Sequence, residues 1–192
     1  MSGYDPQKHH RRSIRLPGWD YRSAAAYFVT ICTHQRERLF DDPLWAEIAA
    51  NAWRAIPNHV ERAVLDEWVL MPNHLHGILV FRDDSVAPLP VGPVDLHWVS
   101  REDDEPRTPL TNAPAGSLGS IIRSYKAAVT RQINRLRQTS CGKVWQRGYF
   151  ERIVRDGPEL ERIRAYIRNN PDRWAAEEDD LNRLLTGMNL RV

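Results

Sequence analysis

Runs of apolar residues, some alternating with polar ones and some continuous, predict four β-strands in this chain. Each run is rich in the β-branched and aromatic residues that strands favour. The predicted strands are 26–33, 63–70, 74–81 and 144–155. The second and third are separated by a short turn that contains Pro72 and Asn73, so together they predict a hairpin.

Apolar residues at helical spacing predict three helices. The predicted helices are 43–56, 117–137 and 156–171. The apolar stripe of the first begins at Leu44, and the stripe of the second extends to Leu136 and includes Tyr125, which we assign to the core. Pro158 suits the first turn of the third helix, and Pro171 predicts its end.

The order of these elements, β-α-β-β-α-β-α, predicts an α+β fold. We expect an antiparallel sheet with helices packed mainly on one face, formed by a single domain over residues 21–176. Residues 1–20 form a basic arm, 82–116 an acidic, proline-rich insertion or loop, and 177–192 a tail with a short helix.

The small net charge of +2 conceals an uneven distribution. Residues 82–116 carry three arginines against seven acids, a net of −4, so the rest of the chain sums to +6. Residues 117–155 carry nine basic side chains against one acid. This cluster favours a polyanionic partner, although charge alone is equally compatible with ordinary solvated helix faces.

Cysteine usage and hydropathy indicate a cytoplasmic protein without a membrane span. The two cysteines have no CxxC partner, which argues against a disulfide framework and a thiolate zinc site. No apolar run reaches the length of about 18 residues that a spanning helix needs. The basic N-terminus also lacks the apolar segment of a secretory signal.

His74 and His76 begin the predicted strand 74–81. Side chains of a strand alternate between its two faces, so these imidazoles share one face and can converge on a single ion. They are either part of a metal site that takes its third ligand from elsewhere in the fold, or structural histidines. The spacing leaves both interpretations open.

The third predicted helix carries a possible ligand and a possible nucleophile. Tyr166 and Asn170 are separated by four residues and share one face of the helix, beside the apolar stripe. That stripe consists of Leu160, Ile163 and Ile167. On helix geometry alone, the favoured interpretation is a core tyrosine and an asparagine that ends the helix before Pro171.

The chain resembles the REP-associated tyrosine transposases, a group within the single-tyrosine HUH superfamily. The resemblance rests on five stretches that occur in this order: "LPGWDYRSAAAYFVTICTHQRERLF", "WVLMPNHLHGILV", "SLGSIIRSYKAAVTRQIN", "VWQRGYFERIVR" and "RIRAYIRNNPDRW". It runs from Leu16 to Trp174 and excludes the 82–116 insertion. It implies a ferredoxin-like antiparallel sheet with the tyrosine helix near the histidine strand.

The resemblance also implies a mechanism. His74 and His76 match the family's metal-ligand histidines, Asn170 matches the polar residue that completes the metal site, and Tyr166 matches the nucleophile. The implied cofactor is Mg²⁺ or Mn²⁺, and the implied reaction proceeds through a 5′-phosphotyrosine link. The implied partner is single-stranded DNA with a hairpin, bound by a monomer or homodimer in the bacterial cytoplasm near the nucleoid.

Basic side chains are the expected DNA contacts, by charge rather than by base recognition. They are Arg12, Arg15, Arg123, Lys126, Arg131, Arg147, Arg152 and Arg155. Relatives commonly have histidine at the position of Arg152. Two other functions remain open: a non-cleaving DNA-hairpin binding protein, and a phosphodiesterase that uses water as its nucleophile.

Overall fold

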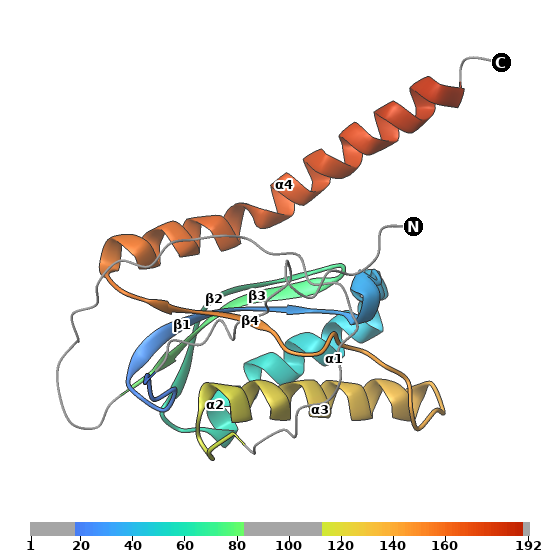
Figure 1. Cartoon of the computed structure of the whole chain (residues 1–192). Coiled ribbons are helices and arrows are strands. Elements are labelled where there is room, and N and C mark those ends of the chain that lie inside the picture. Colours follow the sequence, from blue (N-terminus) through green and yellow to red (C-terminus); the bar gives the residue numbers. More distant parts are fainter. Residues whose placement is uncertain (1–17, 83–112, 190–192) are drawn as a thin grey trace, which may run out of the picture.

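The computed structural model describes residues 18–82 and 113–189, with side chains up to Trp174. Four strands form one antiparallel sheet in the order β2-β3-β1-β4 (Figure 1). The strands are β1 (Ala25–Cys32), β2 (Ala63–Met71), β3 (His74–Phe81) and β4 (Phe150–Val154). This order is the one expected of a ferredoxin-like fold, so the predicted fold class and the β2–β3 hairpin are confirmed.

In the described part of the chain, four α-helices and two short 3-10 helices accompany the sheet. They are η1 (His34–Arg36), η2 (Leu39–Asp41), α1 (Pro43–Arg54), α2 (Ile56–His59), α3 (Leu118–Leu136) and α4 (Gly157–Asn189). Asp42 caps the first turn of α1, and Ser117 caps that of α3. None of these helices, within the described residues, has the length and apolarity required to cross a bilayer.

The helices cover both faces of the sheet, but unequally. Helices α1 and α3 lie side by side on one face, and α4 lies on the other (Figure 1). The first face carries the main core, in which Trp53 and Ile122 pack against the alternate strand residues Val29, Leu75 and Leu79. Tyr125 belongs to this core, as its place in the α3 stripe predicts, and it is 3% exposed.

The predicted strand 144–155 is wrong in its first half. Only Phe150–Val154 pairs with β1, whereas Trp145 makes a single bridge to Thr33. The segment keeps isolated backbone hydrogen bonds, from the Gln146 N–H to the Cys32 carbonyl oxygen and from the His34 N–H to that of Val144. The Lys126 ammonium of α3 also holds it, by donating to the carbonyl oxygens of Gln146 and Gly148.

Three expectations about the helices are also wrong. Pro171 lies inside α4, which continues to Asn189, rather than ending it. The proline lacks an N–H for the helix ladder, and Figure 1 shows the ribbon of α4 bending partway along, as prolines commonly cause. Leu44 and Leu136 are 49% and 51% exposed, because each lies at the outer end of its helix.

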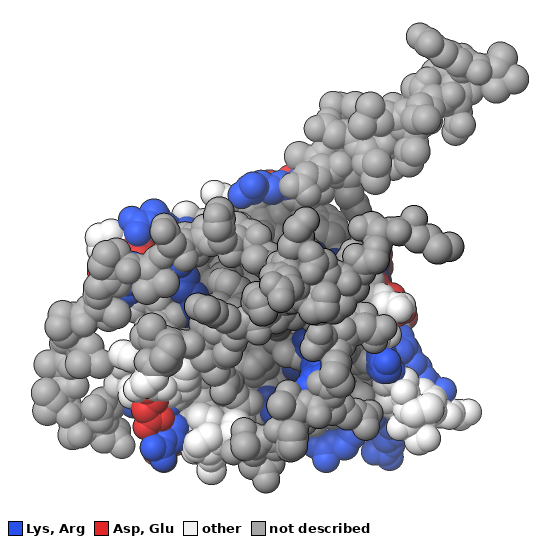
Figure 2. Space-filling view, in the orientation of Figure 1, with Lys and Arg blue, Asp and Glu red and all other residues white. Residues whose placement is uncertain are grey.

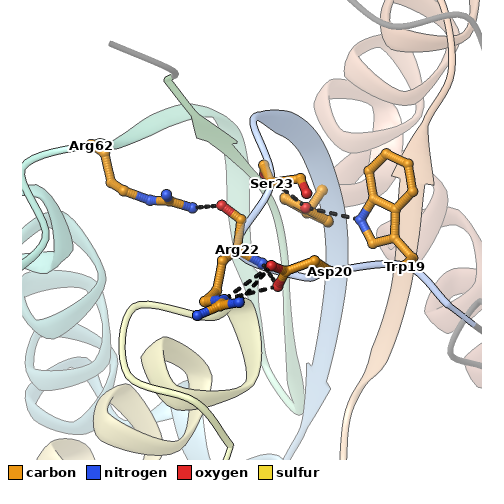
Figure 3. A network of polar contacts seen from close by, with 6 residues as sticks. Trp19, Asp20, Arg22, Ser23 and Arg62 are labelled. Atoms are coloured by element: carbon orange, nitrogen blue, oxygen red, sulfur yellow. Dashed lines mark hydrogen bonds and ion pairs between the residues drawn. The ribbon is translucent and has the colours of Figure 1, made fainter. Parts of the chain in front are cut away.

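A polar network precedes β1 at the end of the sheet opposite the histidines (Figure 3). The indole Nε1 of Trp19 donates to the Tyr27 hydroxyl at 3.1 Å, and the Arg62 guanidinium donates to the carbonyl oxygen of Arg22. Arg22 also pairs with Asp20 at 2.8 Å. The network fixes the chain where it enters the sheet. Residues 1–17 of the predicted arm and 83–112 of the predicted insertion lie outside the described residues.

Candidate active site

His74 and His76 occupy the first and third positions of β3 and share its α4-facing side. Antiparallel register places Thr30 of β1 opposite His76, and Val69 of β2 on its other side. His76 is 3% exposed. The intervening Leu75 faces the main core and is fully buried. Strand alternation therefore gives one apolar side chain to the core and two imidazoles to the opposite face, as the sequence predicts.

The outer ring nitrogens of both histidines already have oxygen partners. His74 Nδ1 lies 2.6 Å from Asn73 Oδ1, and His76 Nδ1 lies 2.8 Å from the Thr30 hydroxyl. An amide oxygen can only accept, so His74 Nδ1 carries the proton and its Nε2 keeps a lone pair. The two Nε2 atoms face each other at 3.0 Å. The Asn73 contact therefore fixes the tautomer of His74, whereas the Thr30 hydroxyl, which can donate or accept, fixes the orientation of the His76 ring.

Burial keeps both imidazoles neutral. Desolvation lowers the pKa of His74 to about 4, with a smaller contribution from the positive charge of Arg36. Desolvation and then the neighbouring His74 lower the pKa of His76 to about 3. A neutral imidazole is the form that ligates metal ions, so the site is ready for a cation at neutral pH.

Tyr166 of α4 lies against the histidines. Its hydroxyl is 3.3 Å from His76 Nε2, and its ring packs edge-on against His76 with centroids 5.2 Å apart. Its ring also meets Phe28 of β1 edge-on. A second apolar cluster of Phe28, Ile78 and Ile167 holds this part of α4 on the sheet. Tyr166 is thus at the edge of the packed stripe rather than in a core.

Asn170 lies one helical turn beyond Tyr166 and is half-buried. One further turn along, the Trp174 ring lies 5.8 Å from the His74 ring. Tyr166 and Trp174 both contact the histidines, and Asn170 lies between them on the same face of α4. This placement puts the Asn170 amide on the side of the helix that faces the imidazole pair.

Ion pairs fix α4 over β2. Asp66 and Glu67 lie in a register irregularity of β2, between Leu65 and Trp68. Arg164 Nε donates to Asp66 Oδ1 at 2.9 Å, and Arg168 bonds Glu67 at 3.1 Å. Neighbouring strand residues normally point to opposite faces, whereas a bulge can redirect one of them. The bulge lets both acids reach the same helix.

A second anchor holds the start of α4. Glu159 is 5% exposed and accepts hydrogen bonds from Arg152 Nε at 2.6 Å and from the backbone N–H of Arg155 at 2.9 Å. Asp156 caps the helix by accepting from the Glu159 N–H. These bonds join the end of strand β4 to the first turn of helix α4, so the start of the helix is fixed relative to the sheet.

The residues fit a divalent cation. Two ligand atoms about 2.1 Å from one ion and at right angles lie about 3.0 Å apart, which is the separation of the two Nε2 atoms. No group of three or more His, Cys, Asp or Glu side chains within the described residues could hold a metal. An amide oxygen, such as that of Asn170, is a ligand type that Mg²⁺ and Mn²⁺ accept.

The basic residues predicted to bind DNA occupy three different settings. Arg123 and Arg131 are exposed on α3, and Arg147 is exposed beyond it. Figure 2 shows Lys and Arg gathered along the lower edge of the molecule, where α3 lies in Figure 1. Arg12 and Arg15 lie outside the described residues.

The remaining three have structural contacts. Lys126 holds the 146–148 segment, and burial lowers its pKa to about 8. Arg152 and Arg155 bind Glu159. Phe150, two residues before Arg152, packs against Phe28 and so contributes to the second apolar cluster.

Sequence reasoning missed three residues of the site: Thr30, Asn73 and Trp174. Thr30 is a polar residue among the buried apolar ones of β1, which is a usable signal, but its partner is 46 residues away. Asn73 was assigned only to the turn. Trp174 follows Pro171, where the helix was expected to have ended. The spacing of four residues from Asn170 is the signal that could have identified it.

Comparison with known proteins places the chain among relatives. A Haemophilus influenzae protein (strain ATCC 51907 / DSM 11121 / KW20 / Rd), described as uncharacterized, is 36% identical over 186 residues, which cover 93% of this chain and 96% of that protein. No model of a known protein family matches the chain. A REP-associated tyrosine transposase, solved bound to a REP hairpin, superimposes with a TM-score of 0.56 and 15% identity, over 84% of this chain and 73% of that one.

Proposed function

We propose that this chain, which belongs to one family with the Haemophilus influenzae protein and has the fold of the REP-associated tyrosine transposases, cuts and rejoins single-stranded DNA. One observation carries the proposal. A tyrosine hydroxyl lies 3.3 Å from one of two neutral histidines whose Nε2 atoms converge. A nucleophile beside a metal-binding pair is the minimum set for transfer of a phosphodiester to protein.

His74, His76 and Asn170 would hold a divalent cation, Mg²⁺ or Mn²⁺. When bound, the cation polarises the scissile phosphate and stabilises its developing negative charge. The two imidazoles are held in place through their Nδ1 atoms by Asn73 and Thr30, so they need no rearrangement to receive it.

Tyr166 is the nucleophile in this proposal. Its oxygen attacks the scissile phosphorus, forming a 5′-phosphotyrosine bond and releasing the 3′-oxygen of the preceding nucleotide. The hydroxyl proton must leave as the bond forms, and solvent receives it, because the lone pair of His76 Nε2 would be held by the cation. Attack by a 3′-hydroxyl on the phosphotyrosine reverses the step, so cutting and joining need no external energy source.

Single-stranded DNA with a hairpin is the proposed substrate. The solved relative by fold is bound to a REP hairpin. The exposed arginines of α3 supply positive charge for the phosphate backbone, and a transposase or a chromosomal strand transferase would use the same residues.

The test is covalent capture. Wild-type protein is incubated with Mn²⁺ and REP-type single-stranded hairpin oligonucleotides, and denaturing gels detect a protein–DNA adduct. We expect an adduct from wild type and none from Tyr166→Phe. Tyr125→Phe is the matched control, because Tyr125 is a buried tyrosine on the opposite face and should leave the yield unchanged.

Three other outcomes would contradict the proposal in different ways. Cleavage that survives Tyr166→Phe indicates a water nucleophile. Hairpin binding without an adduct from wild type indicates a binding protein. An equal loss of adduct in Tyr125→Phe indicates a general defect of folding rather than a missing nucleophile.

A further inference from the structure

Three side chains that the proposed reaction does not use surround the outer side of His74. The Trp174 ring lies 5.8 Å from the His74 ring. The guanidinium carbon of Arg38 lies over the Trp174 ring, 6.0 Å from its centroid, which is within the range of a cation–π contact. Arg36 lies four residues beyond Cys32, the end of β1, which pairs with His74. An aromatic surface and a segment with two arginines thus border the candidate active site.

The segment that carries both arginines is fixed to the histidine turn. The Thr33 backbone N–H donates to the Asn73 carbonyl oxygen at 2.9 Å, and the Thr33 hydroxyl donates to the same oxygen at 3.0 Å. The Phe40 N–H donates to the Pro72 carbonyl oxygen at 2.9 Å. Residues 33–40 and the turn before His74 therefore form one unit, so the distance from the arginines to the imidazoles is set by hydrogen bonds.

The backbone of this segment is held in an unfavourable conformation. Gln35 and Arg36 have φ angles of 52° and 55°, in the left-handed region that non-glycine residues rarely adopt. Arg36 is exposed, while Arg38 is oriented by Asp41, whose carboxylate accepts from its Nε at 2.7 Å. Both arginines follow the end of β1 at Cys32, which pairs with His74, so both belong to the histidine end of the sheet.

We propose that Arg36, Arg38 and Trp174 form a subsite for one nucleotide of a single DNA strand, next to the scissile phosphate. The base stacks on Trp174, and the arginines bind its phosphate. Aromatic rings bind bases of any sequence because every base has a π-face, and arginine binds phosphate through charge-assisted hydrogen bonds. The inference rests on the proposed function, because it assumes that the strand cut at His74 and His76 is DNA.

The subsite orders the strand relative to the nucleophile. Trp174 and Tyr166 lie on the same face of α4, on either side of Asn170. A base held by Trp174 would therefore place its neighbouring phosphodiester toward the imidazoles and Tyr166. Trp174 and the two arginines are positioning residues and take no part in bond formation.

Binding of fluorescein-labelled dT15, measured by anisotropy in Mn²⁺ buffer, tests the subsite. All proteins carry Tyr166→Phe, so binding is read without covalent capture. We expect Arg36→Gln and Trp174→Leu each to weaken binding about tenfold, and Trp174→Phe, which keeps a stacking ring, to retain most of the affinity.

A second cation–π pair of the same composition provides the matched control. Arg54 lies over the Trp68 ring at 5.2 Å, on the side of the sheet that faces the main core. Arg54→Gln and Trp68→Leu remove the same charge and the same ring, and both should bind dT15 as the parent does. An equal loss in Arg54→Gln would show that only net charge matters, which would overturn the subsite.

Photochemical cross-linking locates the base independently of affinity. An oligo(dT) strand with 5-iodouracil in place of thymine is irradiated in the complex, and the modified peptide is identified by mass spectrometry. We expect the cross-link on the peptide that contains Trp174. A cross-link on another aromatic residue, or unchanged affinity in Trp174→Leu, overturns the assignment.

The same proteins separate this inference from the proposed function. The adduct assay uses proteins with Tyr166 intact, and the binding assay uses the Tyr166→Phe proteins. An adduct from wild type, with dT15 binding unweakened in the Arg36→Gln and Trp174→Leu variants, would overturn the subsite and leave the proposed function standing. Weakened dT15 binding by those variants, with no adduct from wild type on any hairpin substrate, would support the subsite and contradict the phosphotyrosine chemistry.

Discussion

The two faces of one sheet do different work in this molecule. The face covered by α1 and α3 buries a continuous core of large apolar side chains, including Trp53 and Ile122. The face covered by α4 buries only a small cluster around Phe28 and Ile167, and it places two imidazoles, a tyrosine and a tryptophan side by side. Helix α4 is held there by this cluster together with ion pairs to β2 and β4.

The comparison is sharpest in β3, where alternate residues belong to different faces. Leu75 and Leu79 pack into the main core, whereas His74 and His76 face α4. Stability and chemistry are therefore separable at single-residue resolution along one strand. A substitution at an odd-numbered position of β3 should change mainly the stability of the fold, and one at His74 or His76 should change mainly the chemistry.

The largest expected effect comes from exchanging neighbours on β3. His76→Ala should reduce adduct formation to background and abolish Mn²⁺ binding, while the free energy of unfolding changes by only about 1 kcal/mol. Leu75→Ala should destabilise the fold by about 2–5 kcal/mol, because Leu75 is fully buried, and should leave the activity of the folded fraction intact. Urea unfolding and adduct yield distinguish them; a large stability loss in His76→Ala would contradict the separation.

Gly77 gives the next largest effect, on the core face alone. A Cβ there would lie 2.5 Å from Trp53 Cζ2, so Gly77→Ala should destabilise the protein by about 1–3 kcal/mol. Gly157→Ala is the control, since a Cβ there meets no atom within 4 Å. Denaturation midpoints measure both. Equal midpoints for the two variants would show that β3 and α1 separate easily.

Much of this arrangement follows from local pattern, and the remainder depends on distant partners. Strand alternation predicts the common face of His74 and His76, and helical spacing predicts that of Tyr166 and Asn170. Strand period also predicts that Asp66 and Glu67 face opposite ways, and the β2 bulge overrides it. The partner of Asp66 is 98 residues away, so no local signal identifies it.

Pro171 shows the opposite limitation. Its sequence context predicts a helix end, since proline removes one backbone donor and disfavours a helical residue before it. The helix continues past it, and Trp174 meets His74 from the continuation. The free-energy cost of one proline inside the helix is therefore smaller than the stabilisation from the tertiary contacts on either side of it.

A smaller effect separates two adjacent asparagines on α4. Asn170→Ala should weaken Mn²⁺ binding about tenfold, because it removes the proposed third ligand. Asn169→Ala is the matched control, since Asn169 is exposed and lies on another face of the helix. Isothermal titration with Mn²⁺ compares the two variants. Equal affinities would assign the third ligand to another residue or to water.

The smallest effect tests the charge anchoring of α4. Hydrogen bonds from Arg164 hold the pKa of the Asp66 carboxyl below its usual value of 3.8. The ionised carboxylate therefore stabilises the fold above that pH, by about 1 kcal/mol, and the contribution is lost as the pH falls through the lowered folded-state pKa.

Asp66→Asn removes this contribution. Urea unfolding should show wild type more stable than the variant at about pH 6, with the difference shrinking toward about pH 3. Asp20→Asn is the control, because the Asp20–Arg22 pair is half-exposed on both sides. A difference that does not change with pH would mean that shape rather than charge holds α4.

The bulge in β2 makes the number of residues between Leu65 and Trp68 important for how α4 is held. Deleting one residue between Leu65 and Trp68 would restore regular alternation and turn one of the two acids away from α4. The histidines, the tyrosine and the asparagine would all still be present in such a protein. Among relatives of this protein, a shortened β2 would therefore identify a copy that keeps every motif residue but has lost the anchor that places its nucleophile.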